Sequence, residues 1–307
     1  MALTDIQGVL LSNDILMRHF IEDGPKVIQL SHRLPFFEID GDTERWATAA
    51  TLSDAAPQPY GGTFTEQTTV PVSRTYTFGY IGTSRTVNHA TQDIQSNVND
   101  QSAVQLEMGV RNILYEFWDQ FITGTGAPGT GQFLGLDAIL ASAPFAGQII
   151  NAGGVALSTS RLDQAIRLLG QGDGWADVIY TSTKGYNAIR EAFFLRGTSP
   201  DQREIQVPDG NGGTKTMAIT HVDGIPCFWS DFVPLETGGT RTKVWILKLG
   251  ERHVHGIIPK SVGKKSMIKV RSVLQPGAAI TEYQMNMASG VSVPSVKDIA
   301  AVTNIAV

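Results

Sequence analysis

The feature that most constrains the fold is a long stretch with helical periodicity at residues 91–122. Apolar side chains recur there every three or four positions, with polar and charged side chains between them. The recurring apolar residues are Ala103, Leu106, Val110, Ile113, Leu114, Phe117 and Phe121. Counted from near Asp93, the pattern predicts a helix of about 30 residues, roughly 45 Å long. The mean helix has about 11–12 residues, so this one is suited to be the backbone of a domain.

A glycine-rich loop follows this helix. Gly124, Gly126 and Gly129 match the G-x-G-x-x-G spacing of dinucleotide-binding turns. That chemistry needs a strand before the glycines and a helix after them, whose N-terminal amides face the pyrophosphate. Here a helix precedes the loop, and we expect Pro128 and residues 133–140 to form an irregular segment. The loop therefore indicates a helix stop and a flexible connection.

The same loop also fails the other common phosphate-binding pattern. Gly126 and Gly131 have the spacing of G-x-x-x-x-G-K, but Gln132 occupies the position of the lysine. That lysine is the side chain that reaches the phosphates. We therefore expect no nucleotide cofactor.

Residues 43–81 are rich in β-formers and contain a turn-forming stretch at 53–62. On the return run, three side chains alternate and are expected to share one strand face: Tyr76, Phe78 and Tyr80. Between residues 46 and 73 the charged residues are Asp54 and Glu66. A long hairpin with so little charge aggregates when it stands free. It must lie on the core of its own domain or on a neighbour.

Residues 157–235 alternate between helical and strand patterns. We expect a helix capped by Ser160, with Asp163 in a capping-box-like position, and ending at Gly170. The further predicted elements are a strand at 178–182, a helix at 184–195, a hairpin turning at 209–213, and strands at 224–232 and 244–249. Before this segment, residues 3–21 have the spacing of a short amphipathic helix or arm.

Composition limits the possible functions. Charged residues make up 17% of the chain, against roughly 25% in a typical soluble domain, which indicates a surface covered by neighbouring subunits. The net charge of −5 argues against a general nucleic-acid binder. The single cysteine, Cys227, excludes an internal disulfide and is expected to be a buried structural thiol. We see no signal peptide and no apolar run long enough to span a membrane.

The sequence shows no catalytic or metal-binding set. His253 and His255 form an H-x-H pair expected to face the same way on a strand, but two ligands are too few for a structural zinc site. The H-E-x-x-H and G-x-S-x-G patterns are missing. A basic excess at residues 252–275 includes Lys269 and Arg271 on one strand face. It is expected to be a solvated or inter-subunit face, with phosphate contact as the alternative. We predict no catalytic, cofactor or metal residues and no enzyme activity.

The order of these parts resembles a known family. An N-terminal arm precedes a weakly charged hairpin, a long helix ending in GTGAPGTGQFLGL (124–136), an α/β segment containing GIPCFWSDF (224–232), and a late basic strand. This resembles the major capsid proteins of tailed phages with the Hong Kong 97-type fold. The resemblance implies an α+β chain with these parts: an N-terminal arm at 1–40, an extension-loop hairpin at 41–80, a peripheral domain with the spine helix at 81–150 and 250–285, and an α/β axial domain at 151–249 and 286–307.

The resemblance also implies a function and partners. Subunits would form pentamers and hexamers and close into an icosahedral shell around double-stranded DNA. The protein would then belong to the virion, after assembly in the host cytoplasm. Its partners would be other copies, a portal, scaffold or decoration proteins, and packaged DNA held by non-specific contact. No membrane is expected. The alternative is an encapsulin-type shell with a protein cargo.

Two features depart from the founding member of that family. We see no charged, scaffold-like helical region before the arm, so we expect a separate scaffold protein or none. No lysine lies between Lys26 and Lys184, so the extension loop lacks the amine needed for lysine–asparagine cross-links.

Overall fold

The computed structural model describes these residues: 30, 33–48, 60, 71–89, 101–169, 175–199, 201–208, 214–260, 267–274 and 279–307. Several expectations fall outside them and stay predictions. They are the arm helix at 3–21, nearly all of the hairpin turn at 53–62, the start of the long helix near Asp93, the stop at Gly170 and the turn at 209–213.

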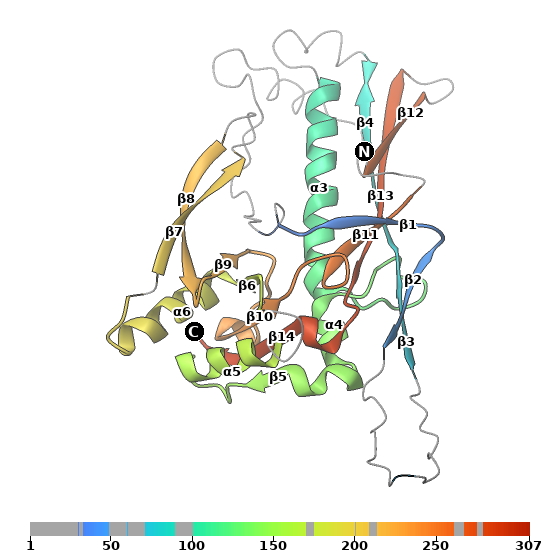
Figure 1. The fold of residues 1–307 in the computed structure, drawn as a ribbon. Helices are drawn as coiled ribbons and strands as arrows, with labels where there is room; N and C mark the ends of the chain where they lie inside the picture. Colours follow the sequence, from blue (N-terminus) through green and yellow to red (C-terminus); the bar gives the residue numbers. More distant parts are fainter. Residues whose placement is uncertain are drawn as a thin grey trace, which may run out of the picture.

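The long helix is present as α3, Gln101–Thr123. It lies along two strands, β4 (Gly79–Asn88) and β13 (Ile280–Ser292), as Figure 1 shows. Of its expected apolar stripe, Ile113, Phe117 and Phe121 are buried, and Leu106 and Val110 pack against the core. Ala103 and Leu114 are exposed. The ring of Phe117 lies 5.3 Å from that of Trp118 and 5.4 Å from that of Phe133. This aromatic cluster fixes the C-terminal half of the helix against the body of the protein.

A smaller sheet of five strands lies beside α3 (Figure 1). Its order is β1–β11–β13–β12, and β4 also pairs with β13. The strands that complete it are β1 (Phe36–Ile39), β11 (His255–Pro259) and β12 (Ile268–Leu274). The β1–β11 pair is parallel and the other pairs are antiparallel. Since β13 pairs with β4, β12 and β11, it is the central strand of this sheet.

A larger sheet of seven strands has the order β5–β14–β10–β6–β9–β8–β7. Its strands are β5 (Ile149–Asn151), β6 (Val178–Thr181), β7 (Asp201–Pro208), β8 (Thr214–Val222), β9 (Ile225–Trp229), β10 (Arg241–Leu247) and β14 (Ile299–Ala306). Two helices pack against it, α5 (Thr159–Leu169) and α6 (Thr183–Leu195). All of β6 is buried, as expected for an apolar strand covered on both faces.

A third pair of strands forms the base of the predicted hairpin. Strands β2 (Thr43–Thr48) and β3 (Val72–Thr77) are antiparallel, in register from Thr43–Thr77 to Thr48–Val72. We call β2 and β3 the hairpin base. The remaining short helices are α4 (Leu136–Ala141), η2 (Ala143–Gln148), η3 (Thr237–Gly239) and η5 (Val296–Asp298). None of the described helices combines the length and apolar character needed to cross a bilayer.

Most predicted elements of the α/β segment are confirmed. The strand at 178–182, the helix at 184–195 and the strands at 224–232 and 244–249 correspond to β6, α6, β9 and β10. Strands β7 and β8 pair antiparallel on either side of residues 209–213. The predicted division into peripheral and axial parts stays a prediction, and β13 continues without a break across its boundary at residue 285.

Three local predictions were wrong. The run containing Tyr76, Phe78 and Tyr80 is not one strand, because it divides at Phe78 into β3 and β4, which belong to different sheets. Tyr76 is accordingly 4% exposed and Tyr80 62% exposed. The segment after the glycine loop is not wholly irregular, since Leu136 begins helix α4, whose apolar residues are buried.

The third error concerns the start of α5. This helix begins at Thr159, one residue before the predicted cap Ser160. The amide of Arg161 lies 3.4 Å from the hydroxyl of Ser158 and also donates to the Ser158 carbonyl. Ser158 therefore has the capping role. Two serines stand two positions apart in LSTSR, and the pattern alone favoured the wrong one.

Candidate functional site

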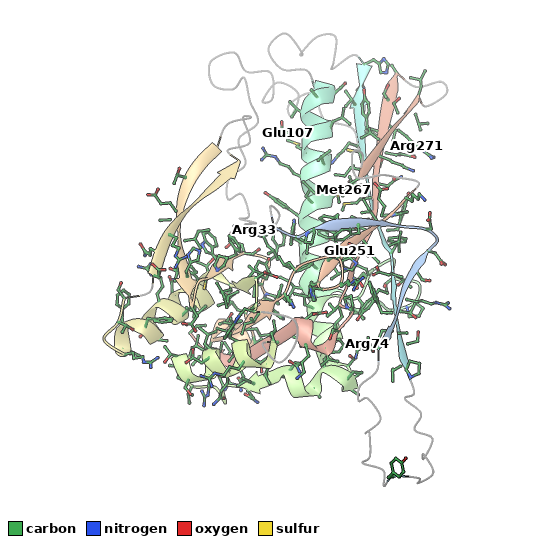
Figure 2. The ribbon with its side chains drawn as sticks, in the orientation of Figure 1. Arg33, Arg74, Glu107, Glu251, Met267 and Arg271 are labelled. Atoms are coloured by element: carbon green, nitrogen blue, oxygen red, sulfur yellow. The ribbon has the colours of Figure 1, made fainter. Side chains whose placement is uncertain are left out.

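The hairpin base is held to the rest of the protein by side-chain contacts from both of its strands. From β3, the Tyr76 hydroxyl donates to the Val293 carbonyl at 2.6 Å, and Arg74 donates to the Pro294 carbonyl at 3.0 Å. The guanidinium of Arg74 also lies 4.9 Å from the centre of the Phe145 ring. Figure 2 shows Arg74 near the lower end of the body. These contacts fix where the hairpin begins.

From β2, Glu44 reaches the first residue of β11. Its Oε1 lies 3.2 Å from Nε2 of His255, which is 1% exposed. The His255 ring is enclosed by Phe37, at 5.3 Å between ring centres, and by Trp46, at 6.4 Å. A carboxylate and an imidazole thus meet in an almost dry environment, where electrostatic interactions are strong.

The electrostatics of Glu44 result from two opposing effects. Burial raises the pKa of its carboxyl group, but the hydrogen bond from His255 opposes this, and the net effect is a pKa below the usual value. The Trp46 indole and the Ser292 hydroxyl also favour the charged form, although neither makes a hydrogen bond of good geometry with it. Glu44 is therefore a carboxylate in the folded protein.

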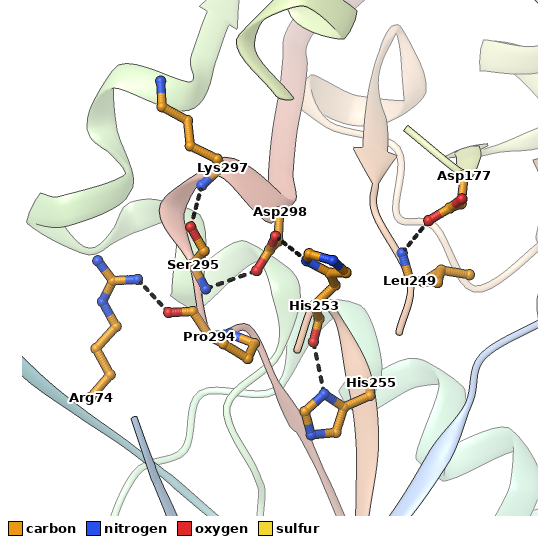
Figure 3. A network of polar contacts seen from close by, with 9 residues as sticks. All are labelled: Arg74, Asp177, Leu249, His253, His255, Pro294, Ser295, Lys297 and Asp298. Carbon is orange, nitrogen blue, oxygen red and sulfur yellow. Dashed lines mark hydrogen bonds and ion pairs between the residues drawn. The ribbon is translucent and has the colours of Figure 1, made fainter. Parts of the chain in front are cut away.

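The two histidines of the H-x-H pair have different partners, as Figure 3 shows. Nδ1 of His255 lies 2.7 Å from the carbonyl oxygen of His253, while Nδ1 of His253 lies 2.8 Å from Oδ1 of Asp298. Asp298 also accepts from the Ser295 amide in the capping box of η5. Burial raises the pKa of the Asp298 carboxyl, although the His253 contact opposes this. Within the described residues no three His, Cys, Asp or Glu side chains are grouped to hold a metal.

The glycine loop uses its amides within the protein. Gly124 donates to the Gln120 carbonyl at 2.9 Å, and Gly135 donates to the Gly124 carbonyl at 2.8 Å. Gly131 accepts from the Tyr80 amide at 2.8 Å, which ties the loop to β4. In a phosphate-binding loop such amides face the ligand, whereas these two are already bonded to carbonyls. The loop is therefore built as a joint between α3 and α4, and the lack of nucleotide binding stays a prediction.

This joint is packed so closely that a side chain at two of its positions would force backbone atoms to shift. A Cβ at residue 135 would lie 2.5 Å from the Gln120 carbonyl oxygen and 2.6 Å from the Gly124 nitrogen. A Cβ at residue 124 would lie 2.4 Å from the Phe133 carbonyl oxygen. Gly124 and Gly135 thus allow two backbone segments to touch.

A charged cluster fixes α4 to the larger sheet. Nζ of Lys243, on β10, lies 3.1 Å from Oδ2 of Asp137 and 2.7 Å from Oε1 of Glu236. Burial raises the pKa of Asp137, with Lys243 opposing. Burial lowers the pKa of Lys243, but the contacts with Glu236 and Asp137 together outweigh this and the net pKa is raised. The lysine is therefore a cation shared between two carboxylates, and it holds the chain that follows the glycine loop.

The remaining candidates from the sequence lie apart from these contacts. Cys227 is buried, as expected, and burial raises the pKa of its thiol to about 12. Lys269 and Arg271 are exposed on β12, and Lys260 pairs with Asp40 at 3.1 Å on the surface. Figure 2 shows Arg271 near the upper end of the body, on the opposite side of the smaller sheet from Glu107. Sequence reasoning missed Glu44, Arg74 and Lys243, because their partners lie far away along the chain.

Comparison of the whole fold defines its class. No protein-family model matches the sequence, and no curated protein does. The fold is the Hong Kong 97-type fold, and the similar solved structures are mostly capsid proteins of tailed phages.

Several solved structures match almost the entire chain. One is the holo-SrpI encapsulin complex of Synechococcus elongatus, which is 18% identical with a TM-score of 0.73, covering 100% of this chain and 97% of that one. Another is the capsid of cyanophage A-1(L), 13% identical with a TM-score of 0.71, covering 99% of each chain. The capsid of a native GTA particle is 10% identical with a TM-score of 0.62, covering 96% of this chain and 97% of that one.

Proposed function

We propose that this protein is the subunit of a closed, capsid-type protein shell. The observation that carries the proposal is the extent of the fold match, which covers nearly the full length of both an encapsulin and a phage capsid protein. The low content of charged residues supports it, because a shell subunit covers much of its surface with neighbours. The bonded amides of the glycine loop also favour a structural role over nucleotide chemistry.

Within this class, the function we favour is the major head protein of a tailed phage. Pentamers and hexamers would close around double-stranded DNA, with a portal and with scaffold or decoration proteins as partners. The prevalence of tailed-phage capsids among the similar structures supports this choice. The acidic net charge supports it as well, because a strongly basic lining would hold the genome and hinder its release.

The second candidate is an encapsulin-type compartment with a protein cargo. It is supported by the match to the SrpI encapsulin over the full chain, with a TM-score of 0.73. Both candidates use the same subunit architecture, so they differ in what the shell contains. On either one, residues 1–40 would be the arm, 41–80 the extension loop, 81–150 and 250–285 the peripheral domain, and the rest the axial domain.

Imaging of the purified protein, with analysis of its contents, tests these alternatives. The full chain is expressed with its neighbouring genes, and particles are isolated by sedimentation and examined by electron microscopy. Closed shells with nuclease-protected DNA support the phage head, and shells with a co-purifying protein support the encapsulin. A folded monomer that forms neither rings nor shells at micromolar concentration, under any salt condition and with its neighbouring gene products present, contradicts the shell proposal.

The hairpin gives a second test of the shell proposal. Replacing residues 53–64 with an Asn-Gly turn shortens the hairpin beyond its base and leaves β2 and β3 intact. We expect a subunit that folds normally by circular dichroism but assembles poorly, because the removed segment would lie on a neighbour. Loss of the folded subunit would show that this segment packs on its own core.

A further inference from the structure

We propose that Glu44 and His255 form a proton-dependent latch that holds the hairpin base on the subunit when His255 carries two ring protons and holds it less firmly when one is lost. The latch is a property of the single subunit. Its consequence for shell assembly rests on the proposed function.

The first step concerns Nδ1 of His255. It lies 2.7 Å from the carbonyl oxygen of His253. A carbonyl oxygen can only accept a hydrogen bond, so Nδ1 must carry a proton. This contact fixes the orientation of the ring.

The second step concerns Nε2 of the same ring. It lies 3.2 Å from Oε1 of Glu44, whose carboxyl group is charged and 14% exposed. A carboxylate can only accept a hydrogen bond, so Nε2 must also carry a proton for this contact to hold. Both ring nitrogens of His255 thus face acceptors, and the bonded state is an imidazolium. After loss of one proton, either a nitrogen lone pair faces the buried carboxylate, or the ring keeps its Nε2 proton and gives up the bond to the His253 carbonyl. In both tautomers Glu44 no longer pairs with a cation.

His253 provides the contrast within the same network. Its Nδ1 contacts Asp298 at 2.8 Å, and its side chain is 28% exposed. The described contacts of its ring are limited to this one nitrogen. A neutral ring with a proton on Nδ1 satisfies that contact, whereas His255 needs a second proton. The two neighbouring histidines therefore differ in how their contacts depend on pH.

The surrounding groups do not replace the missing proton. From β3, Tyr76 stays neutral because burial raises its pKa to about 12, and Arg74 is directed to the Pro294 carbonyl. From η5, Asp298 adds negative charge. The other neighbours of the His255 ring, Phe37 on β1, Trp46 on β2 and Ser292 on β13, do not titrate.

The position of Glu44 gives the latch its effect. Glu44 is on β2, next to residue 43, where the hairpin base begins. The bonds to residues 293 and 294 hold β3, while the His255 contact holds β2. The loss of one proton from His255 thus loosens the β2 side of the hairpin base as the pH rises.

Hydrogen–deuterium exchange of the full-length protein tests the latch. Peptides covering β2 and β3 are followed at about pH 5.5 and about pH 9, which bracket ordinary histidine titration, and rates are corrected for intrinsic exchange. We expect the corrected rate to rise about fivefold or more at the higher pH, because Glu44 either loses its bond to the ring or keeps it only to a neutral donor. Peptides from β6 serve as the internal reference. Equal corrected rates at both pH values would overturn the proposal.

Variants separate the latch from general alkaline loosening. In Glu44→Gln, the new amide can donate to the unprotonated Nε2 of His255, so the exchange rate of the hairpin base should no longer rise with pH. His255→Gln keeps a donor toward Glu44 without a titrating group and should behave likewise. The matched control, His253→Asn, keeps the backbone carbonyl that binds His255 and should retain the wild-type response. A response that survives both Glu44→Gln and His255→Gln, or is lost in His253→Asn, contradicts the assignment.

The assembly state is measured in the same samples by light scattering. A latch that responds to pH in a protein that forms no shell even with its neighbouring gene products present would refute the proposed function and leave the latch intact. Shells whose hairpin base exchanges equally at both pH values would refute the latch and leave the proposed function intact.

Discussion

Replacement of Gly135 by alanine tests how tightly the joint after α3 is packed. The backbone of Gly135 has φ of −85° and ψ of 171°, a conformation that alanine also adopts. The change therefore adds steric contact without left-handed backbone strain. The new Cβ would lie 2.5 Å from the Gln120 oxygen, 2.6 Å from the Gly124 nitrogen and 2.8 Å from the Ile122 oxygen. All three are backbone atoms, so no flexible side chain can move aside.

The expected loss of stability follows from these contacts. Added atoms in a closely packed site cost about 1–3 kcal/mol. Separating Gln120 from Gly124 also weakens their hydrogen bond, worth about 1 kcal/mol. The reduced entropy of the unfolded chain returns about 0.4–1 kcal/mol. We expect a net loss of about 2 kcal/mol, a substantial part of the roughly 5–15 kcal/mol that stabilises a typical domain.

Equilibrium unfolding in urea, followed by tryptophan fluorescence, measures this loss. The midpoint of Gly135→Ala should fall by roughly 1 M or more. The matched control is Gly147→Ala, because a Cβ at residue 147 would meet no atom within 4 Å. Its midpoint should stay unchanged or rise slightly. If both variants unfold at the wild-type concentration of urea, the joint is not sterically locked.

Three further outcomes are expected. The Cys227 thiol, whose pKa burial raises to about 12, should react with Ellman's reagent at about pH 8 only after unfolding; rapid reaction of the native protein would show that the strand opens. Calorimetric titration with NAD or ATP should give no heat, because the Gly124 and Gly135 amides are already bonded; micromolar binding abolished by Gly126→Val would refute this. Boiling assembled particles in detergent should release one band near 33.1 kDa, because residues 41–80 contain no lysine; a ladder that survives reductant would reveal a cross-link from another amine.

The elements that could be predicted from the sequence are those specified by local pattern. Helix α3 repeats its apolar stripe over several turns. The aromatic residues Phe117 and Phe121 belong to that repeating pattern and are also buried in the core. The glycine-rich sequence at 209–213, between two strand-like runs, is enough by itself to predict the β7–β8 hairpin. Helix α4 escaped prediction because it has six residues and no side-chain cap, so its stability comes from buried Leu136, Ile139 and Leu140.

The break between β3 and β4 depends on distant parts of the chain. Gly79 lies directly against the glycine loop, where a Cβ would be 2.7 Å from the Phe133 nitrogen. From that point β4 pairs with β13. The alternating pattern through Phe78 does not indicate that the chain changes its pairing partner there, from β2 to β13. The contact between Glu44 and His255 joins residues 211 positions apart, and the sequence shows each residue without indicating the pairing.

The path of β13 has a mechanical consequence. This strand pairs with β4 from Ile280–Asn88 to Ser289–Gly79, and the chain then continues through η5 into β14, inside the larger sheet. Tension along the protein thus passes from one sheet to the other through covalent bonds. Antiparallel hydrogen bonds lie perpendicular to their strands, so a pull along β13 loads the whole β4 ladder in shear and does not peel it bond by bond. In the proposed shell, a wall of such subunits stretched from within would distribute the load over many bonds at once.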